Sequence, residues 1–381
     1  MKREVIYFNN AATTWPKPKI VDKTVKEFFN YPIAEIGRTT IKGKIDYVES
    51  TRELLCDFFN AENPNHVVFT SNATDSLNLL IHGFVKKNSK KFHVITTELE
   101  HNSVLRPLKT LEKRGLISLS IIPFEENKID IKTLKQEIRS DTRLVVMTQG
   151  SNVLGSVQNI KEIAEYLSAN EIFFIVDGAQ TSGEIEIDLS NIPLDAFVFT
   201  GHKSLFGLTG IGGFYINRPD LIDTIKQGGT GINSNYLYQP EEMPIKFESG
   251  THNYAGIISL YAGIQYLNQV TLPKVESKCK KMTKYLITNL SKIENMEIYN
   301  KNPELPIISF NIKNFDNFEV GSLLSNSYNI IVRTGLHCAP LVHKKIDGGI
   351  GCIRLSLSYL NTMKECEEVV DTLTKIAEIY E

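Results

Sequence analysis

The sequence predicts an α/β fold with a mostly parallel sheet flanked by helices, joined to a smaller α+β C-terminal domain. Between residues 66 and 216, short apolar runs alternate with helical patterns, as they do in proteins built from strands and crossover helices. After about residue 250 this alternation stops, and a long helical stretch precedes further short strands. We therefore expect a large domain over residues 15–255 and a small domain formed by residues 1–14 and 256–381.

The elements of the large domain follow from this alternation. Short apolar runs predict strands at residues 66–70, 93–97, 144–148, 172–177, 196–200 and 212–216. Helical spacing of apolar residues predicts helices at residues 75–85, 103–114, 131–138 and 160–169. Several of the strands end in small or polar residues, and ligands of parallel sheets bind beyond the carboxyl ends of the strands.

The elements of the small domain are fewer. Helical patterns cover residues 257–269 and 274–290, and this long stretch is expected to bridge the two domains. Strands are predicted at residues 297–299, 307–312, 330–333 and 353–357, followed by a last helix over residues 364–379. The mixture of short strands and helices is typical of an α+β unit.

Composition excludes several classes of protein. The 381 residues include 42 Lys and Arg against 44 Asp and Glu, a formal net charge of −2 that argues against a broadly basic nucleic-acid binder. No apolar run approaches the roughly 18 residues of a membrane-spanning helix, and the first residues lack the apolar segment of a signal peptide. We expect a cytoplasmic protein that binds neither membrane nor nucleic acid.

The cysteine pattern argues against a disulfide framework or a structural zinc site, because the number is odd and no CxxC pair occurs. Most of these cysteines are expected to be small buried apolar residues. The five are Cys56, Cys279, Cys338, Cys352 and Cys366.

A lysine after a predicted strand is the strongest local signal for chemistry. Lys203 ends the segment 199–203 and precedes a glycine-rich run at residues 207–213. Desolvation lowers the pKa of a lysine held at the mouth of a site and makes its amine a better nucleophile. Taken alone, the same residues also fit a surface loop.

A carboxylate at the end of another strand supplies the second signal. Asp177 follows the apolar run 172–176, where an unpaired charge is costly. A protonated pyridine nitrogen is a suitable partner, although a helix N-cap or a magnesium ligand would explain Asp177 alone. Together with Lys203 it indicates pyridoxal 5′-phosphate (PLP), whose enzymes combine a Schiff-base lysine with an acidic partner for the ring nitrogen.

Two further strand ends carry weaker signals. The segment 69–78 runs from a strand through small polar residues into a helix, whose first N–H groups favour a phosphate; a simple N-cap is the alternative. It lacks the spacing of a P-loop. His101 also follows a strand, where an imidazole can stack on a cofactor ring and move protons or serve a structural role.

In these motifs the chain resembles the cysteine desulfurases of the class V aminotransferase superfamily, in the branch related to selenocysteine lyase. The similarity extends from the Tyr-Phe-Asn-Asn-Ala-Ala segment at residues 7–12 to the Arg-Leu-Ser segment at residues 354–356. It implies a PLP enzyme of fold-type I that forms a homodimer with sites near the subunit interface.

The resemblance also implies roles for individual positions. The contacts of the cofactor ring correspond to Lys203 for the Schiff base, Asp177 for the ring nitrogen, Gln180 for the phenolic oxygen and His101 for stacking. The phosphate contacts correspond to Ala73, Thr74, Thr200, His202 and, from the other subunit, Thr251. The substrate contacts correspond to Asn152, Arg333 and Arg354, and a guanidinium suits a carboxylate because it binds it bidentately. A surface arginine that closes a strand is the alternative for Arg354.

Cys338, within residues 332–340, separates the candidate reactions. Desulfuration requires a thiolate that attacks the substrate sulfur, and Arg333 and His337, which are cationic or potentially cationic neighbours, are expected to favour that thiolate. The alternative is a buried structural cysteine. With Lys203, Cys338 and His101 as catalytic residues, the resemblance implies conversion of L-cysteine to L-alanine. A persulfide forms on Cys338 and passes to an acceptor protein or a small reductant, for iron–sulfur cluster assembly or thiolation.

Other activities remain open at this point. A selenocysteine lyase or a cysteine sulfinate-acting enzyme would share the cysteine loop, so L-selenocysteine is an alternative substrate. Aminotransferases and epimerases of the same fold need no cysteine, and Cys338 argues against them. A non-catalytic protein that carries or regulates sulfur on this scaffold is the candidate from a different class.

Overall fold

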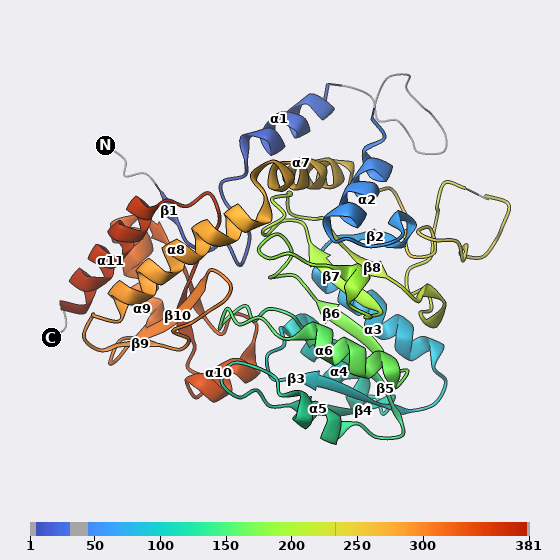
Figure 1. Cartoon of the computed structure of the whole chain (residues 1–381). Helices are drawn as coiled ribbons and strands as arrows, with labels where there is room; N and C mark the ends of the chain where they lie inside the picture. Colours follow the sequence, from blue (N-terminus) through green and yellow to red (C-terminus); the bar gives the residue numbers. More distant parts are fainter. Residues whose placement is uncertain (1–4, 31–44, 233, 379–381) are drawn as a thin grey trace.

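The computed structural model describes residues 5–30, 45–232 and 234–378, and a seven-stranded sheet forms the centre of the large part (Figure 1). β8 is antiparallel to both of its neighbours, β2 and β7, and the remaining adjacent pairs are parallel. The mostly parallel sheet predicted from the sequence is therefore confirmed. The strands lie in the order β2-β8-β7-β6-β5-β3-β4. Their bounds are β2 Val67–Thr70, β3 Phe92–Thr97, β4 Ile117–Ile122, β5 Thr142–Thr148, β6 Phe173–Asp177, β7 Ala196–Thr200 and β8 Gly212–Ile216.

Both faces of this sheet are buried, which explains the continuous apolar runs of its strands. In β6, Phe173 and Ile175 point to the face covered by α3 (Ala73–Lys87) and α4 (Asn102–Lys113). Phe174 and Val176 point to the opposite face. That face packs against α2 Tyr47–Phe58, α6 Ile160–Ala169 and α7 Tyr254–Val270. Among the described residues, no helix is both long and apolar enough to cross a membrane.

The remaining elements of the large part are short or peripheral. The helix α1 packs against α7, and α5 contacts β4 at the edge of the sheet. Their bounds are α1 Lys19–Phe28 and α5 Ile131–Glu137, and three 3₁₀ turns lie at Pro64–His66, Leu189–Asn191 and Pro219–Leu221.

A separate four-stranded antiparallel sheet, in the order β12-β13-β10-β9, forms the centre of the C-terminal part. The helix α8 packs against α11, as Figure 1 shows. The strands are β9 Met296–Ile298, β10 Ile307–Ile312, β12 Arg333–Gly335 and β13 Cys352–Ser356. The helices are α8 Leu272–Leu290, α9 Asn317–Tyr328, α10 Pro340–Ile346 and α11 Met363–Glu378.

The N-terminal segment lies beside this C-terminal sheet. The strand β1 (Ile6–Tyr7) pairs in parallel with β11 (Ile330–Ile331). The Asn10 side chain donates to the Ser356 carbonyl oxygen at 2.9 Å, and the Ala11 N–H donates to the Ser356 hydroxyl at the same distance. These contacts join the two ends of the chain, whereas the domain boundaries near residues 14 and 255 stay a prediction.

The structure differs from the predicted elements in three ways. The edge strand β4 was not predicted, because its central residues are half-exposed and serines interrupt its apolar run. The predicted strand at residues 330–333 is wrong as one unit: it divides between β11, which pairs with β1, and β12, which pairs with β13. The helices α1, α2, α9 and α10 were also not predicted from the pattern.

Candidate active site

A cavity of about 520 Å³ opens at the carboxyl ends of β5, β6 and β7. These ends supply Thr148, Asp177 and Thr200 to its wall. The cavity brings together eleven of the thirteen residues proposed from the sequence, and Cys338 and Thr251 are the two that do not line it. Those eleven are Ala73, Thr74, His101, Asn152, Asp177, Gln180, Thr200, His202, Lys203, Arg333 and Arg354.

Lys203 and Asp177 both line this cavity, and the charge of each affects the other. Loss of hydration lowers the pKa of Lys203 to about 8, with Asp177 acting in the opposite direction. Burial raises the pKa of Asp177, although the Ala179 N–H donates to its Oδ1 at 2.9 Å. A buried carboxylate with few donors requires a cation nearby, so a further positive group would stabilise Asp177 in this cavity.

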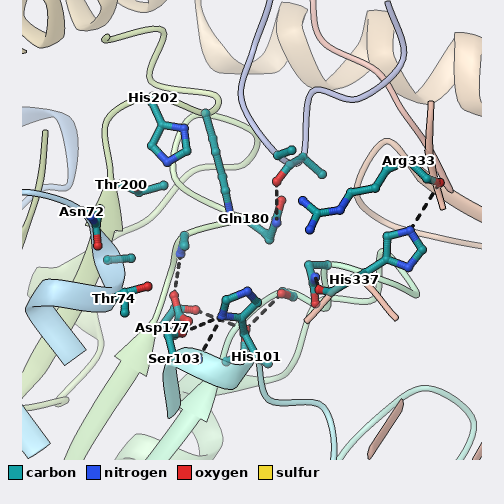
Figure 2. A pocket seen from close by; sticks show the side chains of 18 of the residues that line it. Asn72, Thr74, His101, Ser103, Asp177, Gln180, Thr200, His202, Arg333 and His337 are labelled. Atoms are coloured by element: carbon teal, nitrogen blue, oxygen red, sulfur yellow. Dashed lines mark hydrogen bonds between the residues drawn. The ribbon is translucent and has the colours of Figure 1, made fainter. Parts of the chain in front are cut away.

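His101 is a neutral imidazole with a defined tautomer. It is the N-cap of α4, and its Nδ1 accepts a hydrogen bond from the Ser103 N–H at 3.0 Å (Figure 2). Burial and the charge of Lys203 lower the pKa of His101 to about 4. Because Nδ1 accepts, the ring proton belongs on Nε2, and this nitrogen is available to a ligand.

Unpaired donors gather at one side of the cavity. The Thr200 Oγ1 and the His202 Nδ1 are buried and have no hydrogen-bond partner among the described residues. Ala73 and Thr74 lie beside them as the first two residues of the fifteen-residue helix α3. Hydroxyls and free N–H groups at a helix start are the donors that bind phosphate.

Two arginines occupy the opposite side, as Figure 2 shows for Arg333. Arg354 is fully buried, and its Nη1 donates to the Asn152 carbonyl oxygen at 2.8 Å. Burial and then Arg333 lower the pKa of Arg354 to about 9. Neither guanidinium pairs with a carboxylate within residues 5–30, 45–232 and 234–378. A carboxylate ligand would supply the missing partner.

Cys338 lies on a loop that the rest of the site holds in place. Its Sγ is 3.9 Å from the Arg333 Nη2, and the thiol is partly exposed whereas the other four cysteines are buried. The Cys338 carbonyl oxygen accepts a hydrogen bond from the Asn102 N–H at 2.7 Å. The His337 carbonyl oxygen accepts one from the Asn152 side chain, also at 2.7 Å. Both His337 and Cys338 have positive φ angles, so these contacts maintain a strained turn.

The expectation that His337 is a cationic neighbour of Cys338 is wrong. The imidazole is buried, and this burial, with the charge of Arg354 next in effect, lowers its pKa to about 2. His337 is therefore neutral at every physiological pH. The positive charge beside the Cys338 thiol comes from Arg333.

The family is decided by a match that covers almost the whole chain. Residues 6–369 match the family model described as aminotransferase class-V. The chain belongs to this family. A class V aminotransferase that acts as a cysteine desulfurase uses PLP. The lysine, the buried carboxylate and the unpaired phosphate donors of this cavity fit that cofactor.

Two curated relatives of this chain are named as cysteine desulfurases. A probable cysteine desulfurase of Methanothermobacter thermautotrophicus is 32% identical and covers 98% of this chain and 95% of its own length. The cysteine desulfurase of Salmonella agona is 31% identical over 97% of this chain and 93% of its own.

Solved structures share the fold of this class V aminotransferase. The apo cysteine desulfurase of Thermococcus onnurineus superposes with a TM-score of 0.91 at 29% identity, covering 98% of this chain and 95% of that one. The cysteine desulfurase CsdA of Escherichia coli superposes with a TM-score of 0.90 over the same shares, and at 22% identity it supports the fold alone.

Two of the proposed residues need separate description: Thr251 lies outside the main cavity, and Gln180 lines it. Thr251 is exposed and lines a neighbouring cavity of about 170 Å³ that shares Gly210 with the main one, so its role toward a second subunit stays a prediction. The Gln180 amide donates to the Ala11 carbonyl oxygen at 3.1 Å, which orients it at the cavity wall.

Sequence reasoning missed three residues that line the cavity or form hydrogen bonds with its lining residues. Ser103 sets the tautomer of His101, and its position two residues after a candidate N-cap was the available signal. Lys17 donates to the His202 carbonyl oxygen at 2.7 Å, and burial lowers its pKa to about 7. No local signal identified Lys17, because its partner lies 185 residues away.

Glu100 is a third missed residue, and its burial gives a prediction. Its Oε1 accepts hydrogen bonds from the Thr97 hydroxyl at 2.6 Å and the Thr148 N–H at 3.0 Å, whereas its Oε2 has no partner among the described residues. Burial raises the pKa of Glu100 from 4.5 to about 8, and the charge of Asp177 acts in the same direction. The folded protein therefore keeps a proton on Glu100 at neutral pH.

Replacement Glu100→Gln is expected to stabilise the protein more at pH 8 than at pH 5. The stabilisation by the protonated carboxyl is complete below about pH 4.5 and is lost as the pH rises to about 8, by about 1.4 kcal/mol per pH unit. Glutamine keeps the acceptor oxygen but does not titrate. Thermal unfolding midpoints at the two pH values measure the effect, with the exposed Glu186→Gln as the control. A constant difference between Glu100→Gln and wild type at both pH values would contradict it.

Proposed function

We propose that the chain is a PLP-dependent cysteine desulfurase that converts L-cysteine to L-alanine and transfers the sulfur to an acceptor. The observation that carries the proposal is the Cys338 thiol, held 3.9 Å from Arg333 beside a cavity that contains Lys203 and Asp177. An aminotransferase needs no such thiol. The names of the relatives support the same activity.

The cavity residues would hold the cofactor in the following way. Lys203 would bind it covalently, Asp177 would pair with its ring nitrogen and His101 would lie against its ring. Gln180 would face the phenolic oxygen. The phosphate would bind to Thr74, Thr200, His202 and the backbone of Ala73. When bound, PLP supplies an electron sink for the electrons released as the substrate Cα–H bond breaks.

The protein residues would perform the remaining steps. Arg354, Arg333 and Asn152 would bind and orient the substrate carboxylate. The Lys203 amine, with its pKa lowered to about 8, would take the Cα proton at Nζ. The Cys338 thiolate would attack the substrate sulfur, so that an S–S bond forms as the substrate Cβ–S bond breaks. The electron pair of the broken bond would stay with the carbon fragment, which takes up protons and leaves as L-alanine. His101 would exchange a proton at Nε2.

Assembly and location are also part of the proposal. We propose a homodimer in which Thr251 contacts the cofactor phosphate of the other subunit, because Thr251 is exposed and lines a cavity next to the main one. The sulfur acceptor would be a protein or small thiol that reaches the partly exposed Cys338. A cytoplasmic location and service to iron–sulfur cluster assembly or thiolation complete the proposal.

The proposal is tested by measuring L-alanine and sulfide released from L-cysteine in the presence of dithiothreitol. Equal amounts of both products are expected. L-selenocysteine is assayed in parallel, and release of selenide without any sulfide would favour a selenocysteine lyase. Failure to release alanine from either substrate with PLP bound would refute the enzymatic proposal.

Replacement Arg354→Lys is expected to raise the KM for L-cysteine by about 10- to 100-fold. An ammonium group cannot bind a carboxylate bidentately, and the shorter reach of its donors loses the contact with Asn152. Steady-state kinetics measure the effect, with the exposed Arg106→Lys as the matched control. An unchanged KM in a variant that still binds PLP would show that Arg354 does not bind the substrate.

A further inference from the structure

A buried cluster of two histidines and a cysteine lies directly behind the Cys338 loop. His337, His343 and Cys352 each offer one atom, and these three atoms lie within 4.8 Å of one another. The distance from His337 Nδ1 to His343 Nε2 is 3.2 Å, and the distance from His337 Nδ1 to Cys352 Sγ is 3.9 Å. All three residues are almost completely inaccessible to solvent.

The hydrogen bonds around this cluster orient both rings. The His343 Nδ1 lies 2.6 Å from an oxygen of the buried Asp347 carboxylate, and the His337 Nε2 lies 3.4 Å from the Arg333 carbonyl oxygen. Both of these partners accept. The 2.6 Å contact places a proton on the His343 Nδ1, whereas the longer contact at His337 is compatible with a proton on either ring nitrogen. With His337 in the Nε2–H tautomer, the two inner nitrogens of neutral rings present lone pairs to each other, which is unfavourable unless a cation lies between them.

Either a proton shared between the two inner nitrogens, which the Nδ1–H tautomer of neutral His337 already supplies, or a metal ion satisfies this arrangement. The Cys352 thiol lies beside the same nitrogen pair and adds a third ligand atom, which a metal ion would use and a shared proton would not need. Zinc prefers nitrogen and sulfur ligands in tetrahedral geometry, with bonds of about 2.0–2.1 Å to nitrogen and about 2.3 Å to sulfur. Ligand nitrogens would then be about 3.3 Å apart, and sulfur and nitrogen about 3.6 Å apart. The distances from His337 Nδ1, 3.2 Å to the His343 nitrogen and 3.9 Å to the Cys352 sulfur, are close to these values, and the third pair lies within 4.8 Å.

Charge is also balanced for a divalent ion. A Cys352 thiolate and the Asp347 carboxylate would together neutralise the two positive charges, while the thiol proton would leave to solvent. The guanidinium groups of Arg333 and Arg354 lie nearby and oppose a cation. The carboxylate–histidine pair is the usual support of a zinc-bound imidazole, since it fixes the ring and raises its basicity.

We propose that His337, His343 and Cys352 bind one zinc ion, with Asp347 as the residue that orients His343. The fourth position would be taken by water or a small ligand. The cysteine spacing of the sequence could not predict this site, because its ligands come from the Cys338 loop, α10 and β13. The ion would hold His337 and thus the turn that carries Cys338. This metal site does not depend on the proposed desulfurase activity.

Cobalt binding tests this site without relying on activity. The tag-free holoenzyme is treated with chelator and titrated with Co²⁺, and absorbance is read at wavelengths longer than those of PLP. One equivalent per chain with the intense bands of tetrahedral cobalt is expected, and Zn²⁺ should displace them. Cys352→Ser should weaken binding by more than about 100-fold, and Asp347→Asn by about 10- to 100-fold.

Control variants separate the site from other thiols. Cys279→Ser removes a different buried cysteine and should leave the cobalt bands unchanged. Cys338→Ser should also leave them unchanged, and their loss in that variant would assign the metal to Cys338 and overturn the proposal. Absence of tetrahedral bands in the wild type would favour the shared proton. Because Cys352→Ser could fold poorly, zinc-dependent thermal stabilisation is measured as well, and an equal shift in wild type and Cys352→Ser would also overturn it.

Discussion

Replacement Cys338→Ser is expected to lower the release of sulfide and L-alanine from L-cysteine by at least about 10³-fold. A serine hydroxyl stays protonated beside Arg333, so no nucleophile reaches the substrate sulfur. PLP should remain bound, because Cys338 does not line the cofactor cavity. The assay measures both products with dithiothreitol present, and visible absorbance reports the bound cofactor.

Two further measurements make the Cys338 result specific. Cys279→Ser, which removes a buried cysteine remote from the loop, should retain activity per folded molecule. Mass spectrometry of the wild type after brief exposure to L-cysteine should find one added sulfur on the peptide that contains Cys338. Sulfide release at the wild-type rate from Cys338→Ser would mean that the reaction does not proceed through a persulfide there.

Replacement Lys203→Ala is expected to reduce the same activity by more than about 10⁴-fold. The variant loses both the covalent attachment of PLP and the amine that takes the Cα proton. After borohydride reduction, PLP should remain covalently attached to the wild type and be absent from denatured Lys203→Ala. Peptide mapping of the reduced protein measures the attachment.

The exposed Lys87→Ala is the control for this lysine, since it removes an amine from the surface end of α3. It should retain covalent PLP and activity. Attachment of PLP to a second lysine in reduced Lys203→Ala, with substantial activity, would contradict the role proposed for Lys203.

Much of the site could be predicted because the ends of the buried strands can be recognised in the sequence. Asp177 and Thr200 follow buried apolar runs, and parallel strands bring their carboxyl ends to one edge. The resemblance to a known family then placed Arg354 and Asn152, which lie far apart in the sequence and meet in the cavity at 2.8 Å. Local pattern alone could not have joined them.

The errors and omissions share a physical origin, since they depend on burial. His337 looked cationic in the sequence, but its surroundings lower its pKa to about 2. Glu100, next to His101, carried no prediction, but it is buried and its pKa is raised to about 8. Protonation depends on the three-dimensional environment of a side chain, and sequence alone does not contain that information.

The pairing of β1 with β11 has a consequence for the order in which this protein matures. Asn10 reaches the ribosome exit early, whereas its partner Ser356 is synthesised 346 residues later. Ala11 and Ala12 line the cavity next to those contacts, so the wall they form is incomplete until β13 has emerged. Closing so long a loop is slow relative to local folding. The complete cavity wall is therefore expected only after the C-terminal part of the chain has been synthesised.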